Sequence, residues 1–313
     1  MKCRIFFAVL LVIAAAFAGR WMTRSNSPHA SGRDVTHKTF TLDAGAHVEV
    51  RGINGSVEVK TADTDTADVE VVRITDNAEA LEYSKVNIEG SASNLVVSCE
   101  NNGGRGFWRW LWGGGGSVKQ EVTLTLPRRV ELLTKGVNGP VSVGEVEGPV
   151  SVEGINGRVE VAGSSGRVSM RGVNGQVKFA VAHLGQEGMD IKGVNGNIEV
   201  RFKELVDADI NVKGNNGGLT LNVPNVTMQE RQGHSSMRAR LGSGGTQIEI
   251  KGVNGQIRFE SDAPASANAT TATKVNVTKA TASDDDSDES GGVDEDEADA
   301  PPAPPAPPAR PAN

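Results

Sequence analysis

The histidines, cysteines and carboxylates of this sequence lack the spacings that catalytic and metal sites require. Zinc ligands recur at short, characteristic separations, which the five histidines do not show. There is no phosphate-cradling loop followed by Lys-Ser/Thr, no nucleophile elbow and no Cys–His pair. We therefore predict that the protein is not an enzyme and needs neither cofactor nor metal. The histidines are His29, His37, His47, His183 and His234.

The residue types best suited to binding lie in one segment, 103–116, which reads GGRGFWRWLWGGGG. It holds three of the chain's four Trp, although aromatic residues make up only 4% of the sequence. Flanking glycines predict a mobile loop, and Trp and Arg are enriched at binding hot spots and Trp at membrane interfaces. The segment is either an interaction tip or a plug that closes one end of the fold. The candidate binding residues are Arg105, Phe107, Trp108, Arg109, Trp110 and Trp112.

Most of the remaining chain is built from a short repeat. Residues 135–179 read KGVNGPVSV, GEVEGPVSV, EGINGRVEV, AGSSGRVSM and RGVNGQVKF, five nonapeptides without a gap. In each, a Gly precedes an apolar-polar-apolar triplet, the pattern of a short strand with one buried face. Alternate nonapeptides carry a fuller Gly-Val/Ile-Asn-Gly turn. The predicted unit, here termed a lap, therefore has 18 residues, two short strands and two turns.

The Gly-x-Asn-Gly motif recurs at 52–55, 193–196, 214–217 and 252–255. The last two copies are 38 residues apart, which indicates one intervening lap. Because the period is constant, we favour laps that stack as parallel strands and not hairpins. Asn-Gly forms the sharp turn of each lap, since both residues tolerate positive φ. Stacked Asn side chains should then form a hydrogen-bonded ladder. The predicted structural turn residues are Asn54, Gly55, Asn138, Gly139, Asn156, Gly157, Asn174, Gly175, Asn195, Gly196, Asn216, Gly217, Asn254 and Gly255.

These patterns predict an all-β fold, a single-stranded parallel β-helix or solenoid over residues 40–262. Phe40–Asn101 keeps the strand alternation without the strict period, and a separate small β-domain is the alternative there. Asn77–Ser84 is predicted to form one or two helical turns. Asp, the ligand of calcium-binding β-rolls, is absent from residues 135–179. The outward positions mix charges, so no basic stripe for nucleic acid is expected.

The repeat resembles a known family. Gly-Ile-Asn-Gly followed by alternating Val is similar to the bacterial putative adhesin families that include the head GIN domain, and so are the stretches 122–127 and 251–259. The resemblance covers roughly residues 40–260. It implies a β-solenoid at the cell envelope and supplies no catalytic residues.

The two ends of the sequence have their own compositions. Residues 1–18 read as a secretory signal, with an uncleaved membrane anchor as the alternative. Residues 19–39 are polar and predict a flexible leader. Residues 263–313 hold ten acidic and three basic side chains, a net charge of −7, and end in Pro-rich sequence, which predicts a disordered tail. Without the signal Cys99 is the only cysteine, and its strand pattern indicates a small buried hydrophobe.

Together these features predict a non-enzymatic, secreted or envelope-associated, adhesin-like binding scaffold. The alternative is a periplasmic or envelope structural or stress-response component that docks a membrane partner. A carbohydrate-active enzyme on a β-helix is a third hypothesis, and it would need clustered carboxylates on one face. The expected ligand is a protein, glycan or membrane surface of the envelope, and no nucleic acid. The expected location is the periplasm, the envelope or the cell surface.

Overall fold

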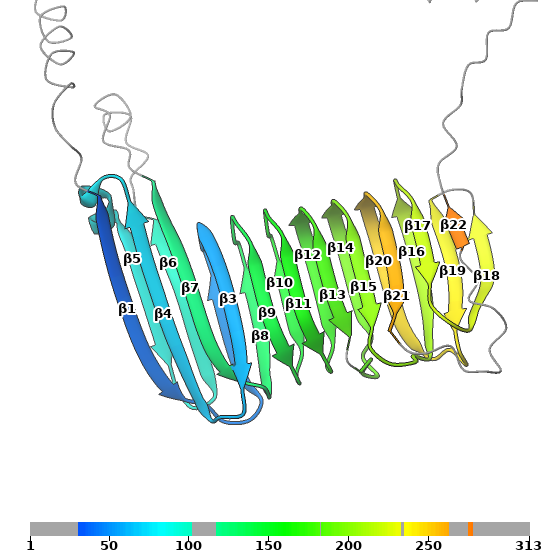
Figure 1. Cartoon of the computed structure of the whole chain (residues 1–313), viewed down its shortest axis with the longest axis horizontal. Helices are drawn as coiled ribbons and strands as arrows, with labels where there is room; N and C mark the ends of the chain where they lie inside the picture. The colour runs from blue at the N-terminus through cyan, green and yellow to red at the C-terminus, as the bar shows by residue number, and fades with distance from the viewer. Residues whose placement is uncertain (1–30, 102–116, 182, 233–234, 263–274, 278–313) are drawn as a thin grey trace, which may run out of the picture. The chain divides into compact units, whose positions relative to one another are not determined.

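The computed structural model describes residues 31–101, 117–181, 183–232, 235–262 and 275–277, and it is all-β (Figure 1). One short 3-10 helix, η1 (Ala78–Tyr83), interrupts the strands. The Asn77 side chain caps it by accepting the backbone N–H of Glu79 at 3.1 Å, which confirms the predicted helical turns. Over the described ranges, no helix is both long and apolar enough to cross a membrane.

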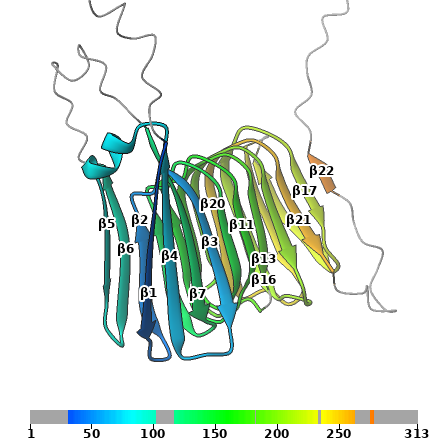
Figure 2. The same cartoon turned by 60° about the vertical axis from the view of Figure 1, so that its left-hand side comes forward.

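The strands form two large mixed sheets (Figure 2). In spatial order, the first sheet consists of β1 (Gly32–Thr41), β4 (Thr66–Thr75), β7 (Val118–Pro127), β3 (Gly55–Ala62), β9 (Val141–Val146), β11 (Val159–Ser164), β13 (Val177–Val181), β15 (Ile198–Phe202), β21 (Ile257–Ser261), β17 (Leu219–Asn222) and β22 (Val275–Val277).

The second sheet is as large. In spatial order it consists of β18 (Val226–Gln232), β19 (Ser236–Leu241), β16 (Ala208–Asn215), β20 (Thr246–Asn254), β14 (Met189–Asn195), β12 (Val168–Asn174), β10 (Val150–Glu153), β8 (Val130–Lys135), β2 (Ala46–Arg51), β6 (Asn94–Asn101) and β5 (Ser84–Gly90).

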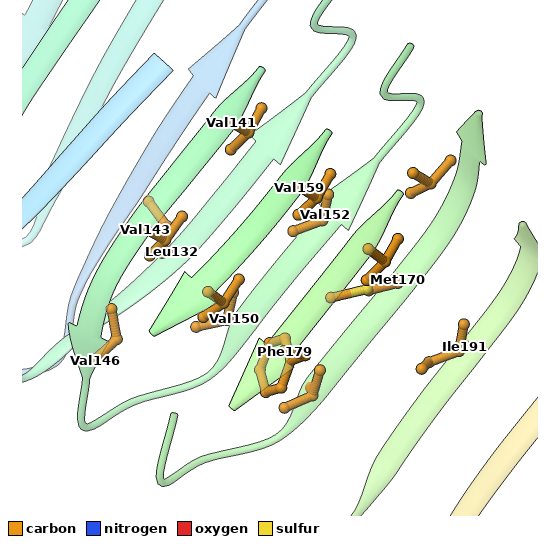
Figure 3. Packing of buried hydrophobic residues seen from close by; sticks show 14 of the residues in the cluster. Leu132, Val141, Val143, Val146, Val150, Val152, Val159, Met170, Phe179 and Ile191 are labelled. Atoms are coloured by element: carbon orange, nitrogen blue, oxygen red, sulfur yellow. The ribbon is translucent and has the colours of Figure 1, made fainter. Parts of the chain in front are cut away.

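In the central part of the chain each lap contributes one strand to each sheet, and successive laps pair in parallel. Val159 of β11 lies opposite Val141 of β9 and Val177 of β13, in steps of 18 residues. All three side chains are buried, which confirms the predicted inward stack. Figure 3 shows valines of both sheets meeting in the space between them. The 18-residue period therefore places equivalent residues of successive laps opposite each other.

At both ends the spatial order departs from the chain order. The lap β2–β3 lies between β6–β7 and β8–β9, and the lap β20–β21 lies between β14–β15 and β16–β17. Beyond them the pairing becomes antiparallel, in β1–β4–β7, β5–β6, β16–β19–β18 and β17–β22. The prediction of a parallel β-helix throughout 40–262 was therefore wrong for the ends.

The lap predicted in the 38 residues between the last two motif copies was also wrong. Strands β18 and β19 form an antiparallel hairpin beside β16. Their sequence has no Gly-x-Asn-Gly turn. Two strands joined by a short connection can pair only in the antiparallel sense, whereas parallel neighbours need a crossover through the other sheet.

One hydrophobic cluster fills the space between the sheets, and it extends from Leu42 to Phe259. Strands of the irregular N-terminal region belong to it, through Val48, Val69 and Leu95. Cys99 is also part of this cluster, and it is 6% exposed. Burial raises the pKa of its thiol to about 11, against the opposing charge of Arg73. Cys99 is therefore the inert, buried hydrophobe that its strand pattern predicts.

Candidate functional site at the asparagine edge

The Trp-rich segment, with the candidate residues Arg105, Phe107, Trp108, Arg109, Trp110 and Trp112, lies outside the described residues. Its two attachment points are described. Strand β6 ends at Asn101 and β7 begins at Val118, and the Val118 carbonyl accepts a hydrogen bond from Asn54 Nδ2 at 3.3 Å. Gln120 Oε1 accepts the backbone N–H of Asn54 at 2.7 Å. The C-terminal attachment point of the segment is therefore hydrogen-bonded to the first Gly-x-Asn-Gly turn.

The seven Gly-x-Asn-Gly turns together form one edge, here named the asparagine edge, where the chain passes from the second sheet to the first. Both glycines of the motif have positive φ: it is 63° at Gly154, with similar values at the other first glycines, and 149° at Gly139, with similar values at five other second glycines. Asn225 is the only described non-Gly residue with positive φ, so the positive φ expected for Asn-Gly is confirmed at the Gly, as at Gly157, and wrong at the Asn. The first glycines, Gly52, Gly136, Gly154, Gly172, Gly193, Gly214 and Gly252, were missed as structural residues.

The second Gly of the motif is required for a further reason, which is space. A Cβ on Gly157 would lie 2.2 Å from the carbonyl oxygen of Gly139 in the neighbouring lap. At the first Gly there is room in every copy except the first: a Cβ on Gly154 would meet nothing closer than 3.7 Å, whereas one on Gly52 would lie 2.6 Å from the Cys99 carbonyl oxygen. The motif therefore needs both glycines for backbone conformation, and the second also for the close approach of adjacent laps.

The Asn side chains of the edge form a continuous amide ladder. Asn156 Nδ2 donates to Asn138 Oδ1 at 3.1 Å and Asn174 Nδ2 donates to Asn156 Oδ1 at 3.3 Å. The spatial order of the ladder is Asn54, Asn138, Asn156, Asn174, Asn195, Asn254 and Asn216. Asn254 thus precedes Asn216, because β20 and β21 insert before β16 and β17.

A row of cations, here named the basic row, runs beside the ladder on the outer face of the second sheet. Each member immediately precedes the first Gly of a motif and lies opposite the corresponding residue of the next lap. The spatial order is Arg51, Lys135, Glu153, Arg171, Lys192, Lys251 and Lys213, and only Glu153 interrupts the cations. This row was missed in the sequence, where the mixed charges at the outward positions led us to expect no basic stripe for nucleic acid. The residue preceding each Gly-x-Asn-Gly was the available signal.

Carboxylates lie beside the basic row but are less exposed than it. Asp190 and Glu249 bridge neighbouring cations: Lys192 Nζ lies 2.7 Å from Asp190 Oδ2 and 3.9 Å from Glu249 Oε2. The Lys192 side chain is 39% exposed, against 13% for Asp190 and 33% for Glu249. Burial opposes ionisation of Asp190, but hydrogen bonds and charge from Lys192 and Arg171 outweigh it and lower its pKa. The carboxylates therefore lie closer to the sheet, and the cationic side chains paired with them are more exposed to solvent.

The outer face of the first sheet differs, because charges of both signs alternate on it as predicted. A shallow groove of about 350 Å³ lies there, lined among others by Ser142, Glu160, Lys178, Glu199 and Arg201. The described residues contain no group of three or more His, Cys, Asp and Glu side chains placed to hold a metal ion.

No family model and no curated protein matches this chain. Solved structures similar to it include a putative cell adhesion protein from Clostridium sporogenes, 11% identical, over 74% of this chain and 100% of that one, with a TM-score of 0.36. A putative adhesin from Bacteroides fragilis is 11% identical over 72% and 97%, with a TM-score of 0.32. A putative lipid binding protein from Parabacteroides distasonis is 11% identical over 74% and 96%, with a TM-score of 0.24. At these scores the functional argument rests on the residues of this chain.

Proposed function

We propose that this protein is a non-enzymatic, exported binding scaffold of the adhesin type. In this proposal its central laps are a parallel β-solenoid, and its asparagine edge faces a ligand of the cell envelope or cell surface. The observation that carries the proposal is repetition: seven laps present the same Gly-x-Asn-Gly turn in register, and in six of them a cation precedes it. Stacked repeats create extended binding surfaces, and many equal contacts give multivalent attachment.

The sequence supports the location and a second contact. Residues 1–18 have the composition of an export signal. The Trp-rich segment follows Asn101 and precedes Val118, whose carbonyl is hydrogen-bonded to the first Asn of the edge. We propose that Trp108, Trp110 and Trp112 add an apolar contact to the same ligand or membrane surface, because Trp suits both binding hot spots and the headgroup layer.

Replacement of Trp108, Trp110 and Trp112 by Ser tests this function. The matched control replaces Val35, Leu205 and Met228 by Ser, three described apolar side chains that are exposed elsewhere. Binding of the full chain to envelope fractions and its melting temperature are measured for both. We expect the Trp variant to lose binding with an unchanged melting temperature, and the control to keep both. A fall in melting temperature for the Trp variant alone would instead support the plug hypothesis.

The alternative function, docking to a membrane partner inside the envelope, is favoured by the concentration of three Trp in one segment. Protease access on intact cells separates the two functions. Cleavage of the protein on intact cells supports the surface adhesin, and protection until the envelope is opened supports the internal component.

A further inference from the structure

The basic row is densest where four consecutive strands each contribute one cation. These are Arg171 of β12, Lys192 of β14, Lys251 of β20 and Lys213 of β16. The three lysines come from separate parts of the sequence, and the insertion of β20 between β14 and β16 brings them side by side. Neighbouring strands in a sheet are about 4.8 Å apart, so the cations repeat along a line at roughly that interval.

The balance of charge along this line favours an anion. Five of the six cations form ion pairs with four neighbouring carboxylates, those of Glu49, Glu153, Asp190 and Glu249. The cations in these ion pairs are 39% to 59% exposed, whereas the carboxylates are 13% to 33% exposed. A ligand that approaches from solvent therefore meets the positive groups first.

The amide ladder adds hydrogen-bond donors parallel to the row. Each Asn amide group carries two N–H groups, and in the six Asn other than Asn54 the ladder uses one of them. In these six the second N–H can donate to a ligand oxygen, whereas Asn54 Nδ2 donates to the Val118 carbonyl. A line of cations beside a line of amide donors fits a linear chain that carries acidic groups at regular intervals. A lipid surface would instead need an apolar, planar contact face, and the row is a single line of polar groups.

We propose that the basic row, Arg51, Lys135, Arg171, Lys192, Lys251 and Lys213, binds a linear anionic polysaccharide that runs across the strands beside the amide ladder. This inference rests on the proposed scaffold function and names its ligand class.

The test uses the full chain and alginate, a linear polymer of uronic acids, with neutral dextran as the uncharged control. Affinity is measured at several salt concentrations, because release of counterions makes such binding salt-dependent. The test variant carries Lys192→Gln, Lys213→Gln and Lys251→Gln. The control variant carries Lys60→Gln, Lys119→Gln and Lys178→Gln, which remove the same charge from exposed positions of the first sheet. We expect roughly a tenfold loss of alginate affinity and a shallower salt dependence for the test variant, and less than a twofold change for the control.

A gain-of-affinity variant keeps the proposal testable even where the triple variant folds poorly. Glu153 is the only acid within the row. Glu153→Gln removes this interruption and should raise alginate affinity severalfold. An unchanged affinity would contradict the proposal.

Three further outcomes overturn the inference. Equal losses in both triple variants would show non-specific charge attraction. Tighter binding to single-stranded oligonucleotides or anionic vesicles than to alginate, at equal charge concentration, would show a different ligand class. Binding to envelope fractions without binding to alginate would refute this inference and leave the scaffold function standing, since the Trp variants test that function separately.

Discussion

The central laps and the two ends of the fold use the same strand alternation but pair their strands differently. From β8 to β15 every strand lies parallel to a strand one lap away. At the ends, β1, β4, β5, β18 and β19 pair in the antiparallel sense. The apolar-polar alternation therefore specifies which face is buried, and the turns specify the direction of pairing.

The difference also assigns different tasks to the two regions. The central laps align like residues, so that one motif generates a glycine column, an amide ladder and a cation row at once. The end strands carry no such columns. They extend the sheets beyond the outermost parallel strands, whose edges would otherwise be exposed. Unpaired sheet edges promote association with other chains. The ends thus protect the repeat, and the repeat carries the candidate function.

The largest expected effect comes from placing a charge inside the central laps. Val159 is fully buried between Val141 and Val177, so Val159→Asp leaves a carboxylate without a partner. We expect a loss of about 3–5 kcal/mol in the free energy of unfolding. Val35→Asp, at a 51% exposed position in the end strand β1, should change it by less than about 0.5 kcal/mol. Thermal unfolding measures both, and equal effects would refute the register of the laps.

The next largest effect separates the two glycine columns. Gly157→Ala forces a Cβ against the Gly139 carbonyl of the adjacent lap and should cost more than about 3 kcal/mol. Gly154→Ala meets only the left-handed backbone penalty, about 1–2 kcal/mol. At Gly148, where the turn lacks the full Gly-x-Asn-Gly motif, a Cβ would also lie 2.2 Å from a carbonyl oxygen, that of Val130. Gly148→Ala should therefore cost as much as Gly157→Ala. A smaller loss for Gly157→Ala than for Gly154→Ala in chemical denaturation would contradict this assignment.

Alkaline pH probes the N-terminal end of the core through Cys99. The folded state raises the pKa of the thiol from 9.0 to about 11, so it holds the proton more tightly than the unfolded chain does. Ionisation of the Cys99 thiol should therefore not affect the free energy of unfolding below pH 9, and should lower it between pH 9 and 11. Relative to Cys99→Val, the loss across this range should reach roughly 2–3 kcal/mol. Parallel pH profiles for the two proteins would show that the thiol is not buried in the folded state.

The smallest expected effect distinguishes an interior rung of the amide ladder from its last one. Asn156 donates to Asn138 and accepts from Asn174, whereas Asn216 has one ladder bond, to Asn254 at 3.4 Å. Asn156→Ala should cost about 1 kcal/mol and Asn216→Ala about half as much, because exposed amide bonds contribute modestly. Denaturant unfolding resolves the two variants. A greater cost at Asn216 would mean that the ladder bonds do not determine the loss.

The sequence was sufficient to predict the central fold because its period is regular. Alternation identified the buried valines, and the 18-residue repeat identified which of them stack, as at Val141, Val159 and Val177. The end strands were unpredictable from the same signals. The sequence of Thr246–Asn254 does not indicate that β20 lies between β14 and β16. A strand with this alternation could pair with any lap of the same period.

The candidate site was visible only in part. The Asn column follows directly from the motif, but the basic row was missed because the mixed outward charges, such as Glu160 and Lys178, belong to the first sheet. The row lies one position before each motif, on the second sheet, and Lys251 joins Lys192 and Lys213 only through the inserted lap. A column of like charge can be read from sequence once the motif is extended by one residue, whereas its order in space requires the structure.

Deletion of one full lap tests the central claim most directly. Removing residues 155–172 joins Gly154 to Val173 and should let β10 pair with β14 and β9 with β13, in unchanged register. Removing the nine residues 158–166 instead shifts the following strand to the wrong sheet. We predict that the 18-residue deletion keeps a β-rich circular dichroism spectrum and cooperative thermal unfolding, and that the nine-residue deletion loses both. Equal behaviour of the two deletions, folded or unfolded, would contradict the lap as the unit of this fold.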